Sequence, residues 1–530
     1  MPLDEIPVLR KAASSRNSIH KARSTWQCLH PDASRSFDPK ALLPTFKCHV
    51  TNRYDIDPTV LGEGADGTVR VASDRTSGQK VAIKEVEIRC DVTRELFLKE
   101  VGIMKDLTHP NICKLMETYE DGALLYLVME FCEGGELFDR ILDNGMTEVD
   151  SVNIIWQVAN ALRYAHSRSI AHRDIKPENV MFSCKDMADG HVQVIDWGMA
   201  AQFDQIQMMD MVGSTIYAAP EVLTAESLHQ EYTCKVDLWS LGVVTYVMLS
   251  GRTPFWGRRA DILRNMAQES YPLSGTPWDT VSSDAKDFIA SLLKRAQDQR
   301  PNAMSVLQHP WMMKRTRAET DMDSMRRVLI RVSEFSTSSH LYILCMAVLA
   351  RQVGHQNLRS VHKVFCELDT NKDGILEIDE FRRGFERVFG AGSVEMESVD
   401  QVFSCLDLDR NGTVDYTEFC AASISEHVKM QEGVLWSAFK SFDTQSDTRI
   451  TKEAIQRVLQ QADLNRRPEH VYGEMARKAL RQHDEDHDGT LDFKEWSKMM
   501  RNCGRSSTKL SVYARLLKCC AGICVARGQR

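Results

Sequence analysis

The stretch HRDIKPEN, His172 to Asn179, decides the fold, because four other short motifs stand in order around it. GEGADGTV (62–69) and VAIK (81–84) precede it, and DWG (196–198) and APE (219–221) follow. Short β-branched runs such as VAIKEV and LLYLVME come first, and helical stretches such as DLWSLGVVTYVMLSG come later. This order predicts a small strand-rich lobe followed by a larger helical lobe.

The five motifs and their spacing resemble the signature set of the protein kinase family, and the resemblance extends from Tyr54 to Met312. The run IKPEN is similar to the Ser/Thr branch of that family. Each motif alone would be weak support, because glycine-rich turns are common. Together they imply an α+β bilobal protein kinase fold and an enzyme that transfers the γ-phosphate of ATP to protein serine or threonine.

The resemblance implies catalytic roles that follow from phosphoryl transfer, in which the protein positions the reactants and neutralises charge. Lys84 would hold the α- and β-phosphates, with Glu100 as its ion-pair partner. Asp174 would accept or orient the proton of the substrate hydroxyl, and Lys176 would lie near the transferred phosphoryl group.

The implied cofactors of this region are ATP and Mg²⁺. Asn179, which also counts among the catalytic residues, and Asp196 would hold Mg²⁺ through hard oxygens. The hinge is expected at LVMEFC, with Met129 as gatekeeper and with backbone groups of Glu130 and Cys132 facing adenine. The other expected nucleotide contacts are Leu61, Gly62, Glu63, Gly64, Ala65, Asp66, Gly67, Thr68, Val69, Lys84 and Glu136.

Further polar residues are expected to support the fold. Asp237 and the pair Glu221–Arg300 resemble structural supports of the kinase family. Arg173 precedes the catalytic aspartate, an arrangement that often needs an anion, and we expect Asp204 or Asp210 to supply it.

Two glutamates leave the choice of substrate open. Acidic residues at the positions of Glu136 and Glu178 can favour an arginine upstream of the phosphorylated residue. Alternatively, Glu136 only contacts the ribose and Glu178 only structures the catalytic loop.

The region from about residue 357 to 502 repeats itself. Aspartates at 369, 407, 443 and 484 each begin a related twelve-residue segment. An EF-hand calcium loop needs oxygen ligands at positions 1, 3, 5, 7 and 12 and a glycine at position 6, and three of the segments meet this pattern. The expected Ca²⁺ ligands are Asp369, Asn371, Asp373, Ile375 and Glu380; Asp407, Asp409, Asn411, Thr413 and Glu418; and Asp484, Asp486, Asp488, Thr490 and Glu495.

The remaining segment, 443–454, is a degenerate EF-hand. It begins with Asp443, but Thr448 replaces the glycine, Arg449 adds a positive charge and Ala454 offers no bidentate oxygens. Ile450 keeps position 8 apolar, where paired loops bridge through a short strand. We therefore predict a structural hand that braces the 484–495 loop, and three bound Ca²⁺ ions in all.

A kinase region followed by four EF-hands closely resembles the calcium-dependent protein kinases of plants and protists, whose second part is an all-α, calmodulin-like EF-hand domain. The run MRRVLIRVSEFS is similar to the start of their autoinhibitory junction, whereas LYILCMAVLA lacks the usual lysines. The hypothesis is that Ca²⁺ opens the hands and pulls the junction off the kinase; a structural linker helix is the alternative. The expected parts are a disordered extension (1–52), the kinase domain (53–312), a junction helix (313–356), the EF-hand domain (357–502) and a basic tail (503–530).

Three residues depart from the kinase pattern. Trp197 replaces the usual phenylalanine, Asp66 stands where the loop tip usually has an aromatic side chain, and Ser214 replaces threonine. Trp197 and Asp66 suggest an alternative function, a calcium-responsive pseudokinase that serves as a binding scaffold. The groups that a pseudokinase would lose are retained, which favours the enzyme: Lys84, Asp174 and Asp196.

Composition limits the partners and the compartment. The net charge of −8 provides no basic field for nucleic acid. Fifteen scattered cysteines without a secretory leader predict reduced thiols in the cytoplasm. The tail places Cys519, Cys520 and Cys524 among basic residues, which suits palmitoylation and membrane association as well as it suits an ordinary basic tail.

Overall fold

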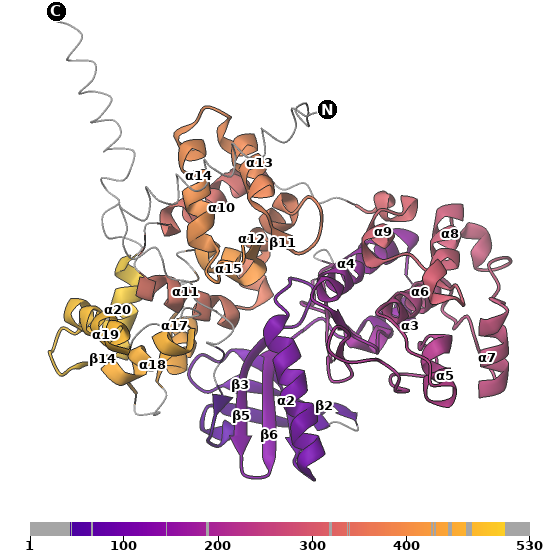
Figure 1. Ribbon diagram of the computed structural model, residues 1–530, viewed down its shortest axis with the longest axis horizontal. Helices are drawn as coiled ribbons and strands as arrows, with labels where there is room; N and C mark the ends of the chain where they lie inside the picture. Colours follow the sequence, from indigo (N-terminus) through magenta and orange to yellow (C-terminus); the bar gives the residue numbers. More distant parts are fainter. Residues whose placement is uncertain are drawn as a thin grey trace, which may run out of the picture.

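A computed structural model describes residues 43, 45–64, 67–144, 146–186, 190–316, 321–336, 338, 340–425, 428, 431–443, 448–462 and 469–503. A strand-rich lobe, a helical lobe and a second helical region follow one another along the chain (Figure 1). Ala65, Asp66 and the three tail cysteines predicted above lie outside the described residues.

The first lobe is built on a six-stranded sheet in the order β1-β5-β6-β4-β3-β2, and α2 (Asp91–Asp106) packs against it. The prediction that residues 1–52 are disordered is wrong at its end, because β1 pairs in parallel with β5 and Val50 is buried. The strands are β1 (Thr45–Phe46), β2 (Tyr54–Gly64), β3 (Gly67–Asp74), β4 (Lys80–Glu87), β5 (Leu115–Asp121) and β6 (Leu124–Glu130), with a 3₁₀ turn at Val50–Asn52.

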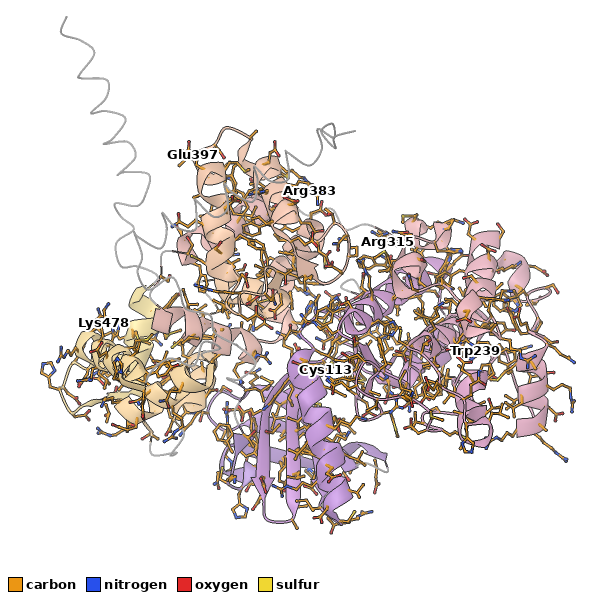
Figure 2. All side chains as sticks on the ribbon, in the orientation of Figure 1. Cys113, Trp239, Arg315, Arg383, Glu397 and Lys478 are labelled. Atoms are coloured by element: carbon orange, nitrogen blue, oxygen red, sulfur yellow. The ribbon has the colours of Figure 1, made fainter. Side chains whose placement is uncertain are left out.

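The second lobe forms around α6, whose side chains are buried almost all round. Trp239 of α6 is fully buried and stacks on Phe255 with ring centroids 5.6 Å apart, deep in this lobe (Figure 2). Its helices are α3 (Leu137–Asn144), α4 (Glu148–Ser167), α5 (Pro220–Leu228), α6 (Lys235–Ser250), α7 (Arg259–Ala267), α8 (Ser283–Leu292) and α9 (Ala303–Leu307). Its short strands are β7 (Ile170–Ala171), β8 (Val180–Phe182), β9 (Val192–Val194) and β10 (Ala201–Gln202), and 3₁₀ turns lie at Pro177–Asn179, Trp278–Thr280, Gln297–Gln299 and Pro310–Lys314.

The junction is two helices, α10 (Met322–Phe335) and α11 (His340–Gln352), and not the single helix predicted. The first ends where the sequence runs Ser-Thr-Ser-Ser, residue types whose side chains compete for backbone hydrogen bonds. The apolar side chains of both helices, such as Val328 and Leu344, belong to the hydrophobic core of the EF-hand region. The junction is therefore part of that region's core.

The EF-hand region pairs its loops as predicted. Strand β11 (Ile375–Leu376) pairs with β12 (Val414–Asp415), and β13 (Arg449–Thr451) pairs with β14 (Thr490–Asp492). Ile450 lies opposite Leu491, so the degenerate loop does brace the 484–495 loop. The helices are α12 (His355–Leu368), α13 (Ile378–Phe389), α14 (Val394–Leu406), α15 (Tyr416–Ser423), α17 (Glu432–Phe442), α18 (Lys452–Ala462), α19 (Glu469–His483) and α20 (Phe493–Cys503).

The EF-hand region lies against the first lobe and the lobe boundary (Figure 1). Lys114, just before β5, donates to the carbonyl of Val353 over 2.9 Å, and the Gln352 amide donates to the carbonyl of Met116 over 3.3 Å. Among the described helices, none is both long and apolar enough to cross a membrane.

Candidate catalytic site and calcium loops

Lys84 of β4 and Glu100 of α2 form the ion pair that the sequence predicts. The Lys84 Nζ lies 2.8 and 3.0 Å from the two carboxylate oxygens of Glu100, and both side chains are buried. The same ammonium lies 3.4 Å from Asp196 Oδ1. Because breaking a buried pair leaves an uncompensated charge, this contact fixes α2 against the sheet.

Asp174 is held by three donors. Its carboxylate accepts from Lys176 Nζ over 2.6 Å, from Asn179 Nδ2 over 3.1 Å and from the backbone N–H of Ser214 over 2.8 Å. Burial opposes the charged form, but the Lys176 ammonium and the Ser214 N–H hold the pKa of Asp174 below its ordinary value. Gly213 permits this approach, since its φ is +82° and a Cβ there would lie 2.4 Å from the Arg173 carbonyl. Motif spacing gave no sign of this backbone contact.

Asn179 and Asp196 offer the oxygens that suit Mg²⁺. The Asn179 amide nitrogen donates to the Asp174 carbonyl over 2.9 Å, which leaves the amide oxygen as a ligand. The Asp196 side chain is 44% exposed, and its backbone is held at φ +58°. Left-handed backbone in a residue other than glycine is strained and is often found at functional sites. The residues present therefore fit Mg²⁺.

Of the two predicted partners of Arg173, Asp204 and Asp210, the structure places Asp210 beside its guanidinium. Its guanidinium lies 2.8 Å from Asp210 Oδ1 and donates to the Tyr232 hydroxyl over 3.0 Å. Burial works against the charged carboxylate, but Arg173 lowers the pKa of Asp210 below its ordinary value. Tyr232 was not predicted, because no motif marks it.

The expected supports are in place. Asp237 is fully buried and accepts backbone N–H groups from both His172 and Arg173, over 2.9 and 2.7 Å. Arg300 donates to both oxygens of Glu221, over 2.5 and 2.8 Å, inside the helical lobe.

Trp197, which replaces the usual phenylalanine, fills a buried position next to His172. It is fully buried, and its ring lies edge-on to that of His172 with centroids 4.6 Å apart. Its indole nitrogen has no hydrogen-bond partner among the described residues.

Glu136 and Glu178 lie close enough to repel one another. Burial raises the pKa of Glu136, and the charges of Asp139 and Glu178 raise it further. One carboxylate oxygen of Glu178 is buried without a hydrogen-bond partner among the described residues. This acidic pair is suited to a cationic group.

Three of the four EF-hand loops hold the first aspartate in the same way. In Asp369, Asp407 and Asp484, Oδ2 accepts the N–H of the glycine at position 6 over 3.0 Å. Oδ1 of each is buried and has no hydrogen-bond partner among the described residues. A buried carboxylate oxygen without a donor is suited to a hard cation, so these loops fit Ca²⁺.

The glutamate at position 12 reaches back across each of these loops. In the second loop, Glu418 accepts the N–H of Leu408 over 2.8 Å and that of Asp415 over 2.9 Å. Glu380 and Glu495 accept the N–H groups of the same two loop positions in their own loops. Each glutamate therefore lies in position to supply two oxygens to one ion.

Like charges crowd the first two loops. Burial, together with Asp373 and Glu380, raises the pKa of Asp369 to about 7, although Lys372 acts in the opposite direction. Burial and Asp409 raise the pKa of Asp407 to about 6. Burial and the neighbouring carboxylates also raise the pKa of Glu418 well above its ordinary value. A divalent cation would relieve this repulsion.

Two positive side chains, one in α17 and one in the loop, pair with carboxylates at the degenerate loop. Asp443 is fully buried and accepts the Thr448 N–H over 3.0 Å, like its three counterparts, but Lys440 Nζ lies 2.7 Å from the same carboxylate. Arg449 pairs with Asp488, a predicted ligand of the neighbouring loop. Thr448 keeps the loop shape at φ +64°, a strained conformation for a β-branched residue.

Two calcium loops touch the catalytic domain. Arg163 of α4 donates to the Asn371 carbonyl in the first loop, and Gly374 of that loop lies against the ring of Tyr164. Thr108 donates to Asp415 of the second loop over 3.1 Å.

The hinge also contacts the EF-hand region. The Glu130 carboxylate accepts the backbone N–H of His355, the first residue of α12, over 2.6 Å. Sequence reasoning missed this contact, because the partners lie far apart in the chain and neither belongs to a shared motif.

A bilobal fold with the Lys84–Glu100 pair, joined to calcium loops, defines a protein kinase with a calcium-binding regulatory region. The protein kinase domain family matches residues 57–312, the EF-hand domain pair matches 359–424, and the EF hand family matches 476–500. The degenerate loop falls outside all three ranges.

Curated relatives match across both parts. The chain is 32% identical over 470 residues to calcium-dependent protein kinase 3 of Plasmodium berghei (strain Anka), covering 88% of this chain and 83% of the relative. It is 30% identical to calcium-dependent protein kinase 19 of Arabidopsis thaliana, covering 92% and 85%. Among solved structures, the twitchin kinase region of C. elegans aligns over 52% of this chain and 48% of its own, with 32% identity and a TM-score of 0.47.

The chain belongs to the calcium-dependent protein kinase family. The predicted fold and the predicted activity, a calcium-activated Ser/Thr protein kinase, are confirmed.

Proposed function

We propose that Asp174 is the group that orients and accepts the proton of the substrate serine or threonine hydroxyl. Its lowered pKa keeps it ionised at neutral pH, and Lys176, 2.6 Å away, is placed to balance charge on the phosphoryl oxygens. Lys84, held by Glu100, would contact the α- and β-phosphates, and Asn179 and Asp196 would hold Mg²⁺. ATP supplies the phosphoryl group and Mg²⁺ neutralises its charge when bound; the protein aligns and shields the reactants.

Hinge and glycine-rich residues complete the proposed nucleotide site. Met129 lies in β6 opposite Ala82 of β4, and Glu130, opposite Val81, is the last residue of that strand. The intact Lys84–Glu100 pair argues against the pseudokinase alternative, because a scaffold has no need of it.

We further propose three Ca²⁺ ions per chain, in loops 369–380, 407–418 and 484–495. The observation that carries this is the buried Oδ1 of Asp369, Asp407 and Asp484, which no donor in the described chain satisfies, set against the Lys440 ammonium beside Asp443. Calorimetric titration of the full chain tests the count. We expect three ions, and the same three in Asp443→Ala; a fourth ion that this substitution removes would contradict the proposal.

Ca²⁺ is proposed to act through the contacts between the loops and the catalytic domain. In this arrangement the junction is packed in the EF-hand core while Lys84 and Glu100 are paired, as expected of the active enzyme. Arg163, Thr108 and Glu130 then link the loops and α12 to the catalytic domain. Arg163→Ala should raise the Ca²⁺ concentration needed for half-maximal activity. A midpoint equal to that of the unaltered chain would show that the loop contact carries no coupling.

The acidic pair Glu136 and Glu178 supports a preference for an arginine upstream of the phosphorylated residue. Two peptides that differ only in arginine or alanine at that place provide the test. The arginine peptide should have the lower KM, and Glu178→Gln should reduce the difference. Equal KM values for both peptides would favour the alternative, in which Glu136 contacts the ribose and Glu178 structures the catalytic loop.

A cytoplasmic enzyme that is palmitoylated on Cys519, Cys520 or Cys524 is also proposed, on the sequence of the tail alone. Hydroxylamine-sensitive acylation, absent when all three cysteines are changed to serine, is the expected result. An unmodified tail would leave the protein without this membrane anchor.

A further inference from the structure

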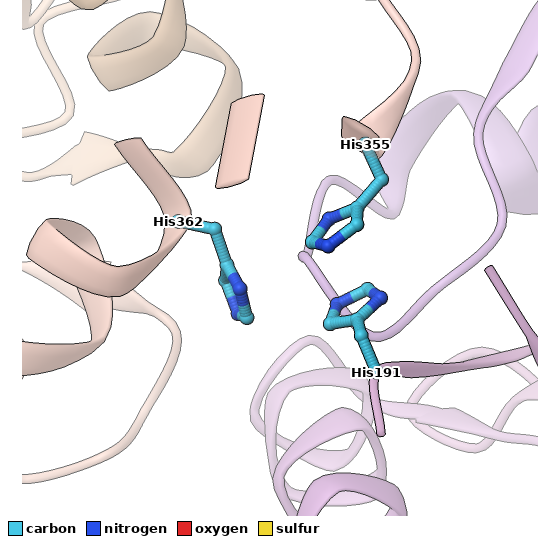
Figure 3. A group of neighbouring side chains, drawn as sticks. All are labelled: His191, His355 and His362. Atoms are coloured by element: carbon cyan, nitrogen blue, oxygen red, sulfur yellow. The ribbon is translucent and has the colours of Figure 1, made fainter. Parts of the chain in front are cut away.

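Three histidines meet where the EF-hand region packs on the catalytic domain (Figure 3). His191 precedes β9 in the helical lobe, whereas His355 and His362 lie on α12, seven residues apart and so on one face of the helix. One ring nitrogen from each lies within 4.8 Å of the other two. His191 and His355 are buried, and His362 is half-buried.

The three rings are packed against one another. His191 and His355 are stacked, with centroids 3.5 Å apart and planes 6° from parallel. His362 stands edge-on to both, at 4.7 Å from His191 and 5.2 Å from His355, as Figure 3 shows. Because imidazole lone pairs lie in the ring plane, the stacked pair has to tilt open for all three histidines to bind one ion.

His191 is oriented as metal-binding histidines are. Its Nδ1 lies 2.6 Å from the Ser183 hydroxyl, which fixes the ring, and its Nε2 has only a long contact of 3.3 Å to the Asn111 amide.

A sulfur donor lies one turn further along α12. Cys366 Sγ is 3.2 Å from His362 Nε2, although it does not belong to the group within 4.8 Å that the three imidazoles form. Nitrogen and sulfur ligands of one tetrahedral Zn²⁺, at about 2.0 and 2.3 Å from the ion, are separated by a similar distance. Arg359 is the nearby cation on the same helix, and it lies 3.6 Å from Asp186, which offsets its charge.

We propose that His191, His355 and His362, with Cys366 as a fourth donor, form a binding site for a borderline divalent metal such as Zn²⁺. Imidazole and thiolate suit such an ion, whereas the oxygen-only calcium loops do not. Because one ligand comes from the catalytic domain and the others from α12, the site is complete only while the two parts are docked. The bound ion would stabilise the docked arrangement.

Titration of the full chain with Co²⁺, in saturating Ca²⁺ so that the EF-hand loops are filled, tests the site. Tetrahedral nitrogen and sulfur ligation gives strong visible absorption bands. We expect one equivalent of Co²⁺ with these bands and its displacement by one equivalent of Zn²⁺. His191→Gln and His362→Gln should each weaken Zn²⁺ binding at least about 10-fold, the loss that even outer partners of a metal ligand can cause.

His470→Gln, an exposed histidine of α19, is the matched control and should bind like the unaltered chain. Cys366→Ser should keep the ion but shift the Co²⁺ spectrum. Far-ultraviolet circular dichroism and Ca²⁺-dependent activity show whether each variant is folded. Weak binding that is equal in all variants, or binding lost in His362→Gln but kept in folded His191→Gln, would overturn the bridging site.

Discussion

Buried charged side chains face opposite charges in the catalytic domain but like charges in the first EF-hand loops. In the catalytic domain, Lys84 faces Glu100 and Arg300 faces Glu221, so opposite charges balance within the protein. In the first two EF-hand loops, buried carboxylates face other carboxylates and their pKa values are raised. The first arrangement is electrostatically complete, whereas the second is completed by a cation, and this makes it responsive to Ca²⁺.

The degenerate loop shows which property matters. It keeps the loop shape, the buried first aspartate and the strand pairing of its neighbours. It differs in its ion pairs: Lys440 of α17 pairs with the buried Asp443, and Arg449 pairs with Asp488, so opposite charges balance there as they do in the catalytic domain. Under the proposed count of three ions, a loop keeps this shape without binding Ca²⁺, and the cations near Asp443 and the missing carboxylate at Ala454 set it apart.

The largest effect is expected in the catalytic site. Asp174→Asn should lower kcat about 10³- to 10⁴-fold, since it removes the group that accepts the hydroxyl proton. Peptide phosphorylation at saturating Ca²⁺ measures it, and Asp143→Asn, on the exposed face of α3, is the control. Activity within tenfold of the unaltered enzyme would mean that Asp174 is not that group.

A large effect is also expected in the second EF-hand loop. Glu418→Gln removes a charged bidentate ligand and should weaken Ca²⁺ binding on the order of 100-fold, out of the range of calcium sensors. Glu453→Gln, the exposed neighbour of Ala454 in the degenerate loop, should change nothing. Isothermal calorimetry compares the two variants, and equal affinities would remove the distinction between the loops.

Protons should compete with Ca²⁺ in the crowded loops. With folded pKa values of about 7 for Asp369 and about 6 for Asp407, both carboxylates are ionised at pH 8, whereas at pH 6 Asp369 is largely protonated and Asp407 is about half protonated. Because Ca²⁺ binds the ionised form, affinity in the first pair should fall roughly 10-fold as the pH drops from about 8 to about 6. Titrations at several pH values test this, and an affinity that is flat across the interval would show that these groups are already ionised.

A smaller change is expected where the degenerate loop contacts the 484–495 loop. Arg449 pairs with Asp488, so Arg449→Gln should strengthen Ca²⁺ binding in the 484–495 loop by roughly 2- to 5-fold, as befits a half-exposed ion pair. Arg457→Gln on α18 is the control. Weaker binding in Arg449→Gln would mean that the guanidinium organises the loop and does not compete with the ion.

The smallest effect concerns stability. Thr448→Gly should raise the free energy of unfolding by about 1 kcal/mol, because φ +64° is strained for threonine and not for glycine. Urea unfolding of the full chain, followed at the transition that reports the second EF-hand pair, measures it. A decrease would show that the threonine side chain stabilises the loop in another way.

Sequence motifs predicted those contacts whose partners both belong to motifs, such as Lys84–Glu100 and the Ile450–Leu491 register. Pattern alone left Asp204 and Asp210 open as partners of Arg173. The two-residue strand β1 and the Glu130–His355 contact escaped prediction, because each depends on packing between distant segments. The break between α10 and α11 escaped because apolar periodicity continues on both sides of it.

Transfer of phosphate from ATP to a serine peptide, measured in the full chain against free Ca²⁺ from nanomolar to micromolar, tests whether calcium controls this catalytic site. The account predicts low activity at nanomolar Ca²⁺, a steep rise toward micromolar Ca²⁺, and, in Asp174→Asn, no such rise above the activity that remains after the loss of this group. Activity that is equal across the whole range would contradict it.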